Sequence, residues 1–118
     1  MIKLVAMLKR REDLTLEEFL EYYERRHVPL FARSIPPDVA DAIIYYVQNH
    51  AVGLGATGGD PPFDCVTEFG FEDLEGLRRW TSWYLGPEGN VLREDEEKFM
   101  DTSRRVVVVT EEHRLPHR

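Results

Sequence analysis

The residue best suited to proton transfer in this sequence is His27. Leu16, Leu20, Tyr23 and His27 recur every three or four positions, which predicts an apolar stripe along one helix. Pro29 disfavours helical geometry just beyond, so we expect His27 in the last turn, on the buried side. Imidazole there could take a proton from an acidic carbon or phenol, or give one to a leaving oxygen. Alternatively, the ring only caps the last carbonyl groups and complements the helix dipole.

Aromatic side chains form a second group of candidates, and we predict that they bind the substrate. They are Tyr23, Tyr45, Tyr46, Trp80 and Trp83. Their rings could line an apolar pocket while the polar tips bind ligand atoms. A phenol near His27, either Tyr23 or Tyr46, could hydrogen-bond a developing oxyanion. The alternative is that these rings form ordinary hydrophobic core.

Asp95 is the candidate carboxyl group. It falls between Val91, Leu92 and Phe99 on the apolar side of a short predicted helix. A carboxyl group in such surroundings suits acid or base chemistry, and we include it among the substrate-binding residues. Alternatively, the short helix is only half buried and Asp95 reaches solvent.

A glycine-rich segment, Gly53 to Gly58, matches the pattern G-x-G-x-x-G after a predicted strand. A dinucleotide site needs a helix to begin at these glycines. Here Gly59, Asp60 and two prolines follow, and then another strand. We interpret the segment as a flexible loop that could serve as a lid.

The sequence shows no pattern of a metal or cofactor site, and we expect neither a metal nor a cofactor. None of the four histidines pairs at the spacing of a helical metal site. Cys65 is the single cysteine and lies in a predicted strand, which favours a packed side chain over a nucleophile. No G-x-S-x-G turn is present.

Composition excludes several classes of partner. The 118 residues carry a formal net charge of -7, and their basic pairs are scattered among acidic neighbours. This argues against nucleic acid or an anionic membrane as a partner. No signal peptide or membrane-length apolar run is evident, so we expect a cytoplasmic protein of one domain, residues 1–118.

The order of elements predicts an α+β fold. We expect strands near 2–9, 39–50, 63–71 and 103–110, and helices over 15–27, 72–84 and about 90–100. This order is typical of a ferredoxin-like βαββαβ sandwich, with helices on one face of an antiparallel four-stranded sheet.

Apolar residues on both faces of two strands predict a homodimer. The centre of the second strand and the run Val106 to Val109 are apolar on both sides. Two helices cover only one sheet face, and a soluble monomer rarely exposes a large apolar patch. We therefore expect two copies packed sheet against sheet about a two-fold axis. The alternative is that the C-terminal tail or the long loop covers this face.

The run FLEYYERRHVPL resembles the helix signature of the EthD family, within the dimeric α/β-barrel superfamily of ferredoxin-like proteins. The matching pattern is Phe-x-x-Tyr-x-x-x-x-His-x-Pro, and His27 occupies the position of the family's characteristic histidine. The resemblance implies a sheet-to-sheet homodimer with a cleft between sheet and helices. Superfamily relatives include cofactor-free cyclases, isomerases, decarboxylases and dehydratases for aromatic or polyketide-like molecules, and some haem-dependent enzymes.

Two functions remain open at this level. The first is a cofactor-free lyase, isomerase or cyclase in which His27 moves a proton on a small phenolic or keto substrate. The second is a non-catalytic dimer that binds a small hydrophobic ligand or serves as an accessory factor, as other EthD-like proteins do.

Overall fold

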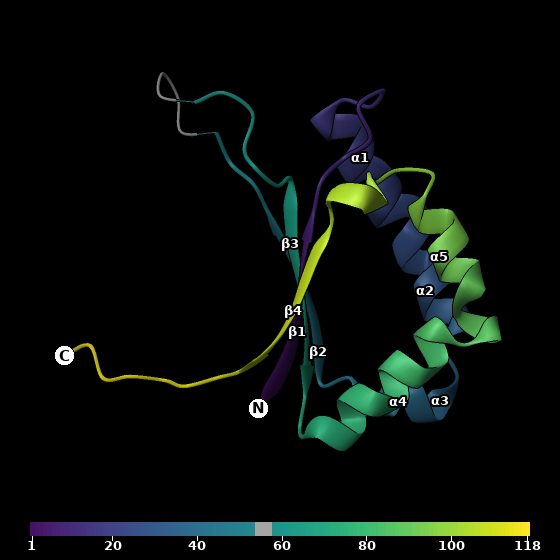
Figure 1. Cartoon of the computed structure of the whole chain (residues 1–118), viewed down its shortest axis with the longest axis vertical. Helices are drawn as coiled ribbons and strands as arrows, with labels where there is room; N and C mark the ends of the chain where they lie inside the picture. The colour runs from purple at the N-terminus through teal and green to yellow at the C-terminus, as the bar shows by residue number, and fades with distance from the viewer. Residues whose placement is uncertain (54–57) are drawn as a thin grey trace.

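One antiparallel sheet carries all the helices on a single face (Figure 1). The computed structural model describes residues 1–53 and 58–118. Its strands are β1 (Ile2–Leu8), β2 (Tyr45–His50), β3 (Cys65–Phe71) and β4 (Val106–Glu111). They are arranged in the order β2-β3-β1-β4, and each neighbouring pair is antiparallel. The predicted ferredoxin-like α+β fold is confirmed.

Five α-helices pack against the inner face of the sheet, with short turns of other helix types between some of them. The α-helices are α1 (Leu16–Tyr22), α2 (Val28–Ser34), α3 (Pro37–Ala42), α4 (Leu74–Leu85) and α5 (Asn90–Glu96). A π-helical turn spans Tyr23–His27, and 3₁₀ turns span Pro87–Gly89 and Thr102–Arg104. None of the helices in the described residues is long and apolar enough to span a membrane.

The helix starts follow from local capping. The Thr15 side chain accepts a hydrogen bond from the Glu18 backbone, and the Glu18 side chain accepts one from the Thr15 backbone. This is the predicted capping box. Asp73 caps α4 by accepting from the Gly76 backbone N–H. Both caps satisfy backbone donors that the first helical turn leaves unpaired.

The helical segment does not end at His27, as the sequence predicted, but continues to Ser34. The backbone N–H of Val28 donates to the carbonyl of Tyr23, five residues back, and this bond defines a π turn. Pro29 lies in the first turn of α2, where a missing N–H costs little. The wide turn therefore lets the chain pass proline without a break. His27 does lie on the buried side, with 5% of its surface exposed.

The second strand begins at Tyr45 and not at Val39. Residues Pro37–Ala42 form α3 instead, with Pro37 in its first turn and Asp38 at its positive end. Val39 is buried in the core formed with Trp80 and Phe71. Tertiary packing and the proline start thus outweigh the β-propensity of this segment.

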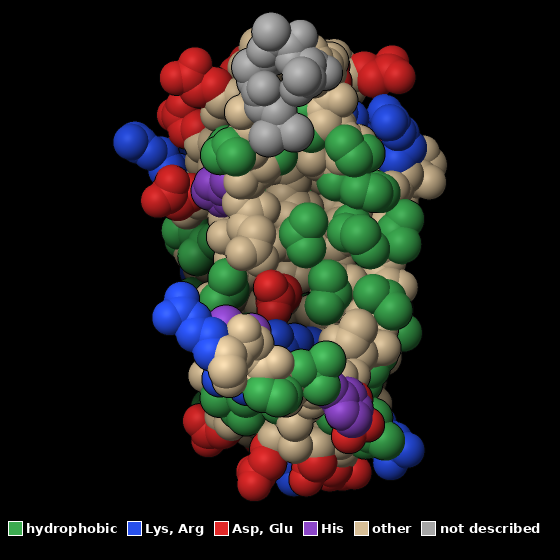
Figure 2. All heavy atoms as spheres, turned by 90° about the vertical axis from the view of Figure 1, so that its left-hand side faces the viewer, with side chains coloured by type: hydrophobic (Ala, Val, Ile, Leu, Met, Phe, Trp, Pro, Cys, Tyr) green, Lys and Arg blue, Asp and Glu red, His purple; other side chains and the backbone are tan. Residues whose placement is uncertain are grey.

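The outer face of the sheet is apolar and open to solvent (Figure 2). Because Val107 lines the helix side, the alternation along β4 places Val106 and Val108 on the outer face. Their exposed fractions are 46% and 43%. Beyond β4, the C-terminal segment runs away from the sheet in Figure 1, and Leu115 within it is 80% exposed. The tail thus projects outward on this side of the sheet without lying along β4, whose valines stay exposed.

Candidate functional site

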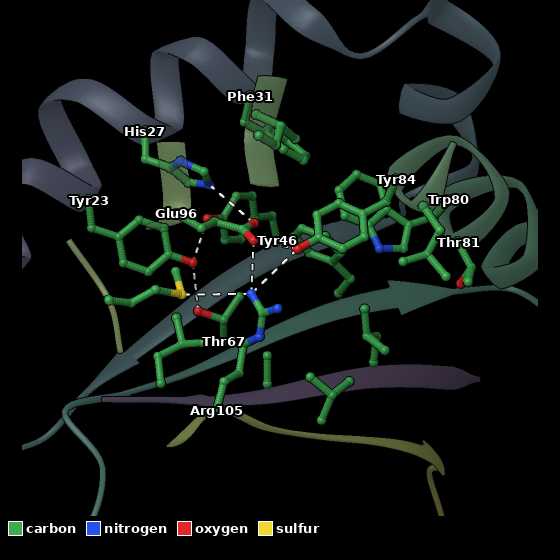
Figure 3. A pocket seen from close by; sticks show the side chains of 18 residues that line it. Tyr23, His27, Phe31, Tyr46, Thr67, Trp80, Thr81, Tyr84, Glu96 and Arg105 are labelled. Carbon is green, nitrogen blue, oxygen red and sulfur yellow. Dashed lines mark hydrogen bonds and ion pairs between the residues drawn. The ribbon is translucent and has the colours of Figure 1, made fainter. Parts of the chain in front are cut away.

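A cavity of about 310 Å³ lies between the inner face of the sheet and the helices. Its walls are largely apolar and include Leu4 and Ala6 of β1, Phe69 of β3, Phe31 of α2 and Trp80 of α4. Figure 3 shows the polar side chains that converge on it from opposite sides. They are Tyr23, His27, Tyr46, Thr67, Thr81, Tyr84, Glu96 and Arg105. The volume is at the lower end for small-molecule sites, which suits a ligand of about one or two rings.

His27 is fixed in the cavity wall by a carboxylate behind it. Its Nδ1 lies 2.9 Å from Oδ2 of Asp95, and both side chains are more than nine-tenths buried. The hydroxyl of Tyr22 donates to the other oxygen of Asp95 at 2.7 Å. A carboxylate only accepts hydrogen bonds, so this pairing favours the proton on Nδ1 and leaves Nε2 for the cavity.

The π turn determines where His27 and Tyr23 point. Both residues lie within the turn, and their ring centroids are 5.7 Å apart in an edge contact. Phe99 packs against both rings, at 5.3 Å from Tyr23 and 5.0 Å from His27. Single π turns occur frequently at functional sites.

Glu96 faces His27 from α5. Its Oε1 accepts a hydrogen bond from Arg105 Nη1 at 2.8 Å and another from the hydroxyl of Tyr84. Its Oε2 lies 3.9 Å from Nε2 of His27, too far for a hydrogen bond. Glu96 and Asp95 are adjacent in α5, so one helix places a carboxylate on each side of the imidazole.

A chain of hydroxyl groups forms another wall. Tyr46 donates to the hydroxyl of Tyr23 at 2.8 Å, and the Tyr23 and Thr67 hydroxyls are 2.8 Å apart. The side-chain amide of Gln48 donates to Tyr46 at 3.2 Å. Burial raises the pKa of Tyr46 to about 12 and that of Tyr23 well above its ordinary value. Both phenols therefore stay neutral at physiological pH and can act as hydrogen-bond donors.

The buried phenols predict that alkaline pH destabilises the protein. Because the folded-state pKa of Tyr46 is about 12 against an ordinary value of 10.0, the folded protein binds more protons between these values. The associated stability is complete below pH 10.0 and is lost as pH rises towards 12. Urea unfolding at stepped alkaline pH should show this decline, and Tyr46→Phe should make it shallower. Equal slopes for both proteins would contradict the assignment.

The remaining sequence features add no second site. Among residues 1–53 and 58–118, no group of three or more His, Cys, Asp or Glu side chains could hold a metal ion. Cys65 is fully buried, and burial raises the pKa of its thiol. The centre of the Gly53 to Gly58 motif, residues 54–57, lies outside the described residues, so its interpretation as a loop or lid stays a prediction.

Comparison with known proteins identifies the family. A family model described as the EthD domain matches residues 11–103. The chain belongs to the EthD family. A search of curated proteins gives no match. The predicted family resemblance is thus confirmed.

Solved structures share the fold of this EthD protein. An ethyl tert-butyl ether D (EthD) family protein from Bacillus halodurans matches with 26% identity and a TM-score of 0.67, covering 96% of this chain and 99% of that one. An EthD-like protein from Ralstonia eutropha matches with 21% identity and a TM-score of 0.67, covering 93% and 89%. A dimeric protein of unknown function and ferredoxin-like fold from Bacteroides fragilis matches with 18% identity and a TM-score of 0.55, covering 93% and 94%.

Four of the side chains singled out by sequence lie at the cavity of this EthD protein: His27, Tyr23, Tyr46 and Trp80. Asp95 lies behind His27 and touches the imidazole, so it is placed to orient that ring and not to line the cavity. Of the two alternatives for Asp95, the buried one is correct, since 7% of its surface is exposed.

Two further predicted substrate-binding residues, besides Asp95, do not line this cavity. Tyr45 lies on the outer face of the sheet, because it precedes the cavity-lining Tyr46 in β2, and its hydroxyl donates to Glu68 at 3.4 Å. Trp83 packs on Trp80, with ring centroids 5.8 Å apart, outside the cavity wall. Side-chain alternation along the strand separates Tyr45 from its neighbour.

Sequence reasoning missed Glu96 and Arg105. A signal for Glu96 existed: it follows the buried Leu92 by four positions, so both share one helix face. Arg105 precedes the valine run of β4 in extended backbone, and no local pattern indicates that it turns toward a cavity.

Proposed function

We propose that this EthD protein is a cofactor-free acid–base enzyme of the lyase, isomerase or cyclase type. Its substrate is a small aromatic or polyketide-like carbonyl compound bound in the cavity between sheet and helices. The observation that carries this proposal is the placement of His27. Asp95 holds Nδ1 at 2.9 Å, and Nε2 faces the cavity.

The His27–Asp95 pair suits proton abstraction from a carbon next to a carbonyl. Neutral imidazole with a free Nε2 accepts the proton, and the adjacent carboxylate stabilises the imidazolium that forms. The electron pair of the broken C–H bond moves onto the carbonyl oxygen. The hydroxyl of Tyr23, which accepts from Tyr46, can turn its own proton from Thr67 to that oxygen.

The apolar walls favour a ring over a charged metabolite. Phe31, Phe69 and Trp80 contact one another around the cavity, with Phe69 and Trp80 edge to face at 4.9 Å. Edge-to-face aromatic contacts form a rigid surface for a flat apolar ligand. This composition supports an aromatic or polyketide-like substrate.

Deuterium exchange into β-tetralone tests the proposal. This fused-ring ketone carries acidic α-hydrogens and suits the cavity in size and polarity. In deuterium oxide, the protein should catalyse incorporation of deuterium at the α-carbons, followed by NMR, with saturation at high ketone concentration. Saturable binding without exchange would favour the alternative function, a non-catalytic ligand-binding or accessory dimer.

We also propose that the protein is a homodimer joined through the outer face of its sheet. Val106 and Val108 of β4 and Val47 of β2, which is 41% exposed, support this interface. The Bacteroides fragilis structure is described as dimeric, which agrees with the proposal. A second copy would remove these side chains from water, the main driving force for such association.

A charge on the outer face is expected to dissociate the proposed dimer. Val108→Asp places a carboxylate from each copy in the proposed apolar interface, where its desolvation opposes association. Sedimentation at micromolar concentration should give twice the chain mass for the wild type and the monomer mass for the variant. Val52→Asp is the matched control, since Val52 is already 79% exposed. A monomeric wild type would refute the interface.

A further inference from the structure

The carboxylate of Glu96 has one oxygen held by the protein and one that faces the histidine. Arg105 and Tyr84 both donate to Oε1. Only 8% of the surface of Glu96 is exposed. Among the described residues, no group donates a hydrogen bond to its Oε2. Oε2 is accessible from the cavity and is not sealed in the core, so a ligand bound there can donate a hydrogen bond to it.

The unpaired atoms of Glu96 and His27 face one another. Nε2 of His27 and Oε2 of Glu96 are 3.9 Å apart, and both side chains line the cavity (Figure 3). An atom beside the line joining them can lie within about 2.6–3.2 Å of both, the reach that proton transfer requires. Alternatively, one ligand atom can contact Nε2 of His27 while a neighbouring ligand atom contacts Oε2 of Glu96.

Each group is held rigidly by its own partner. Asp95 fixes the far nitrogen of His27, and Arg105 with Tyr84 fixes the far oxygen of Glu96. Asp95 and Glu96 are consecutive residues of α5, so the helix backbone fixes their relative positions. Preorganised groups of this kind need little rearrangement when the proton moves.

We propose that Glu96 is a second catalytic residue and that the enzyme relocates a proton between two positions of one ligand; this rests on the acid–base role proposed above for His27. The substrate class is an unsaturated cyclic ketone or the dienone form of a phenol. Nε2 of His27 takes the proton from the α-carbon, and the Glu96 carboxylate receives it from the imidazolium.

The electrons and protons of this step balance without another reactant. The C–H bond at the α-carbon breaks, and its electron pair forms the double bond of a dienolate. Glu96 then gives this proton to the γ-carbon or to the oxygen, where a new C–H or O–H bond forms. His27 is then neutral and Glu96 is a carboxylate again, so both groups are back in their starting states.

Two probes separate proton abstraction from proton relocation. The first is α-deuterium exchange of β-tetralone, which His27 alone can support. The second is isomerisation of β,γ-cyclohexenone to its conjugated isomer, followed by ultraviolet absorbance. Glu96→Gln is expected to slow isomerisation by about 10²–10⁴-fold and to slow isomerisation far more than exchange. Glu97→Gln is the matched control, because the neighbouring Glu97 is exposed and outside the cavity.

Each outcome bears on a different claim. The role of Glu96 would be overturned if the Glu96→Gln variant isomerised the ketone at the wild-type rate. It would also be overturned if the variant lost isomerisation and exchange to the same extent. Exchange without isomerisation in the wild type would overturn proton relocation and leave the proposed function standing. Absence of both reactions in the wild type would overturn the proposed function itself. If circular dichroism shows that Glu96→Gln does not fold, Glu96→Asp tests the role of Glu96 instead. The shorter side chain keeps the charge but moves the carboxylate away from His27. Isomerisation should then fall more than exchange.

Discussion

Replacing His27 with alanine is expected to slow α-deuterium exchange of β-tetralone by about 10²–10⁴-fold, the usual contribution of a positioned acid or base. The reason is that Nε2 of His27 is the cavity nitrogen oriented by a buried carboxylate. The NMR assay at saturating ketone isolates the chemical step from binding.

Two experiments distinguish a catalytic role of His27 from a structural one. His27 also packs against Tyr23 and Phe99, so the alanine variant leaves a small cavity in the core. Added imidazole should fill that space and restore part of the exchange. His50→Ala is the matched control, since His50 is an exposed histidine at the end of β2. If a folded His27→Ala protein catalysed exchange at the wild-type rate, His27 would serve only in packing.

Asp95→Asn should impair exchange about as severely, by a factor on the order of 10²–10⁴. The carboxylate accepts a hydrogen bond from Nδ1 and so keeps Nε2 free. An asparagine amide can donate to Nδ1 instead, which moves the ring proton to Nε2 and leaves no base facing the cavity. Ring-nitrogen NMR shifts of His27 would report this change of tautomer directly.

Tyr22→Phe is the control for Asp95. It removes the 2.7 Å hydrogen bond to the other carboxylate oxygen but leaves the oxygen that faces His27. The exchange rate should therefore change far less than in Asp95→Asn. If Asp95→Asn changed the tautomer of His27 but still catalysed deuterium exchange at the wild-type rate, the tautomer of His27 would not matter for proton transfer.

Sequence periodicity was sufficient to identify the fold and one wall of the cavity. The stripe that includes Tyr23 and His27 predicted a buried histidine, and alternate residues of β3, such as Cys65 and Thr67, are buried in the same periodic way. These patterns work because burial repeats with the geometry of the helix or strand itself.

The remaining features depend on contacts that no local pattern reports. The π turn at Tyr23–His27 results from one shifted backbone hydrogen bond, which lets the helix continue past Pro29. Residues near Val39 have strand propensity, but the proline start and the buried position of Val39 favour α3. Arg105 meets Glu96 through a hydrogen bond between the residue before β4 and α5, which are nine positions apart in the chain.

The most direct test of the central claim compares the wild-type protein with an equal concentration of free imidazole. Both are assayed for deuterium incorporation into β-tetralone, with and without tetralin, which has the same fused rings but no carbonyl group. We predict faster exchange with the protein, saturation in ketone, and inhibition by tetralin because it occupies the apolar cavity. Exchange no faster than with free imidazole, without saturation, would contradict an acid–base site at His27.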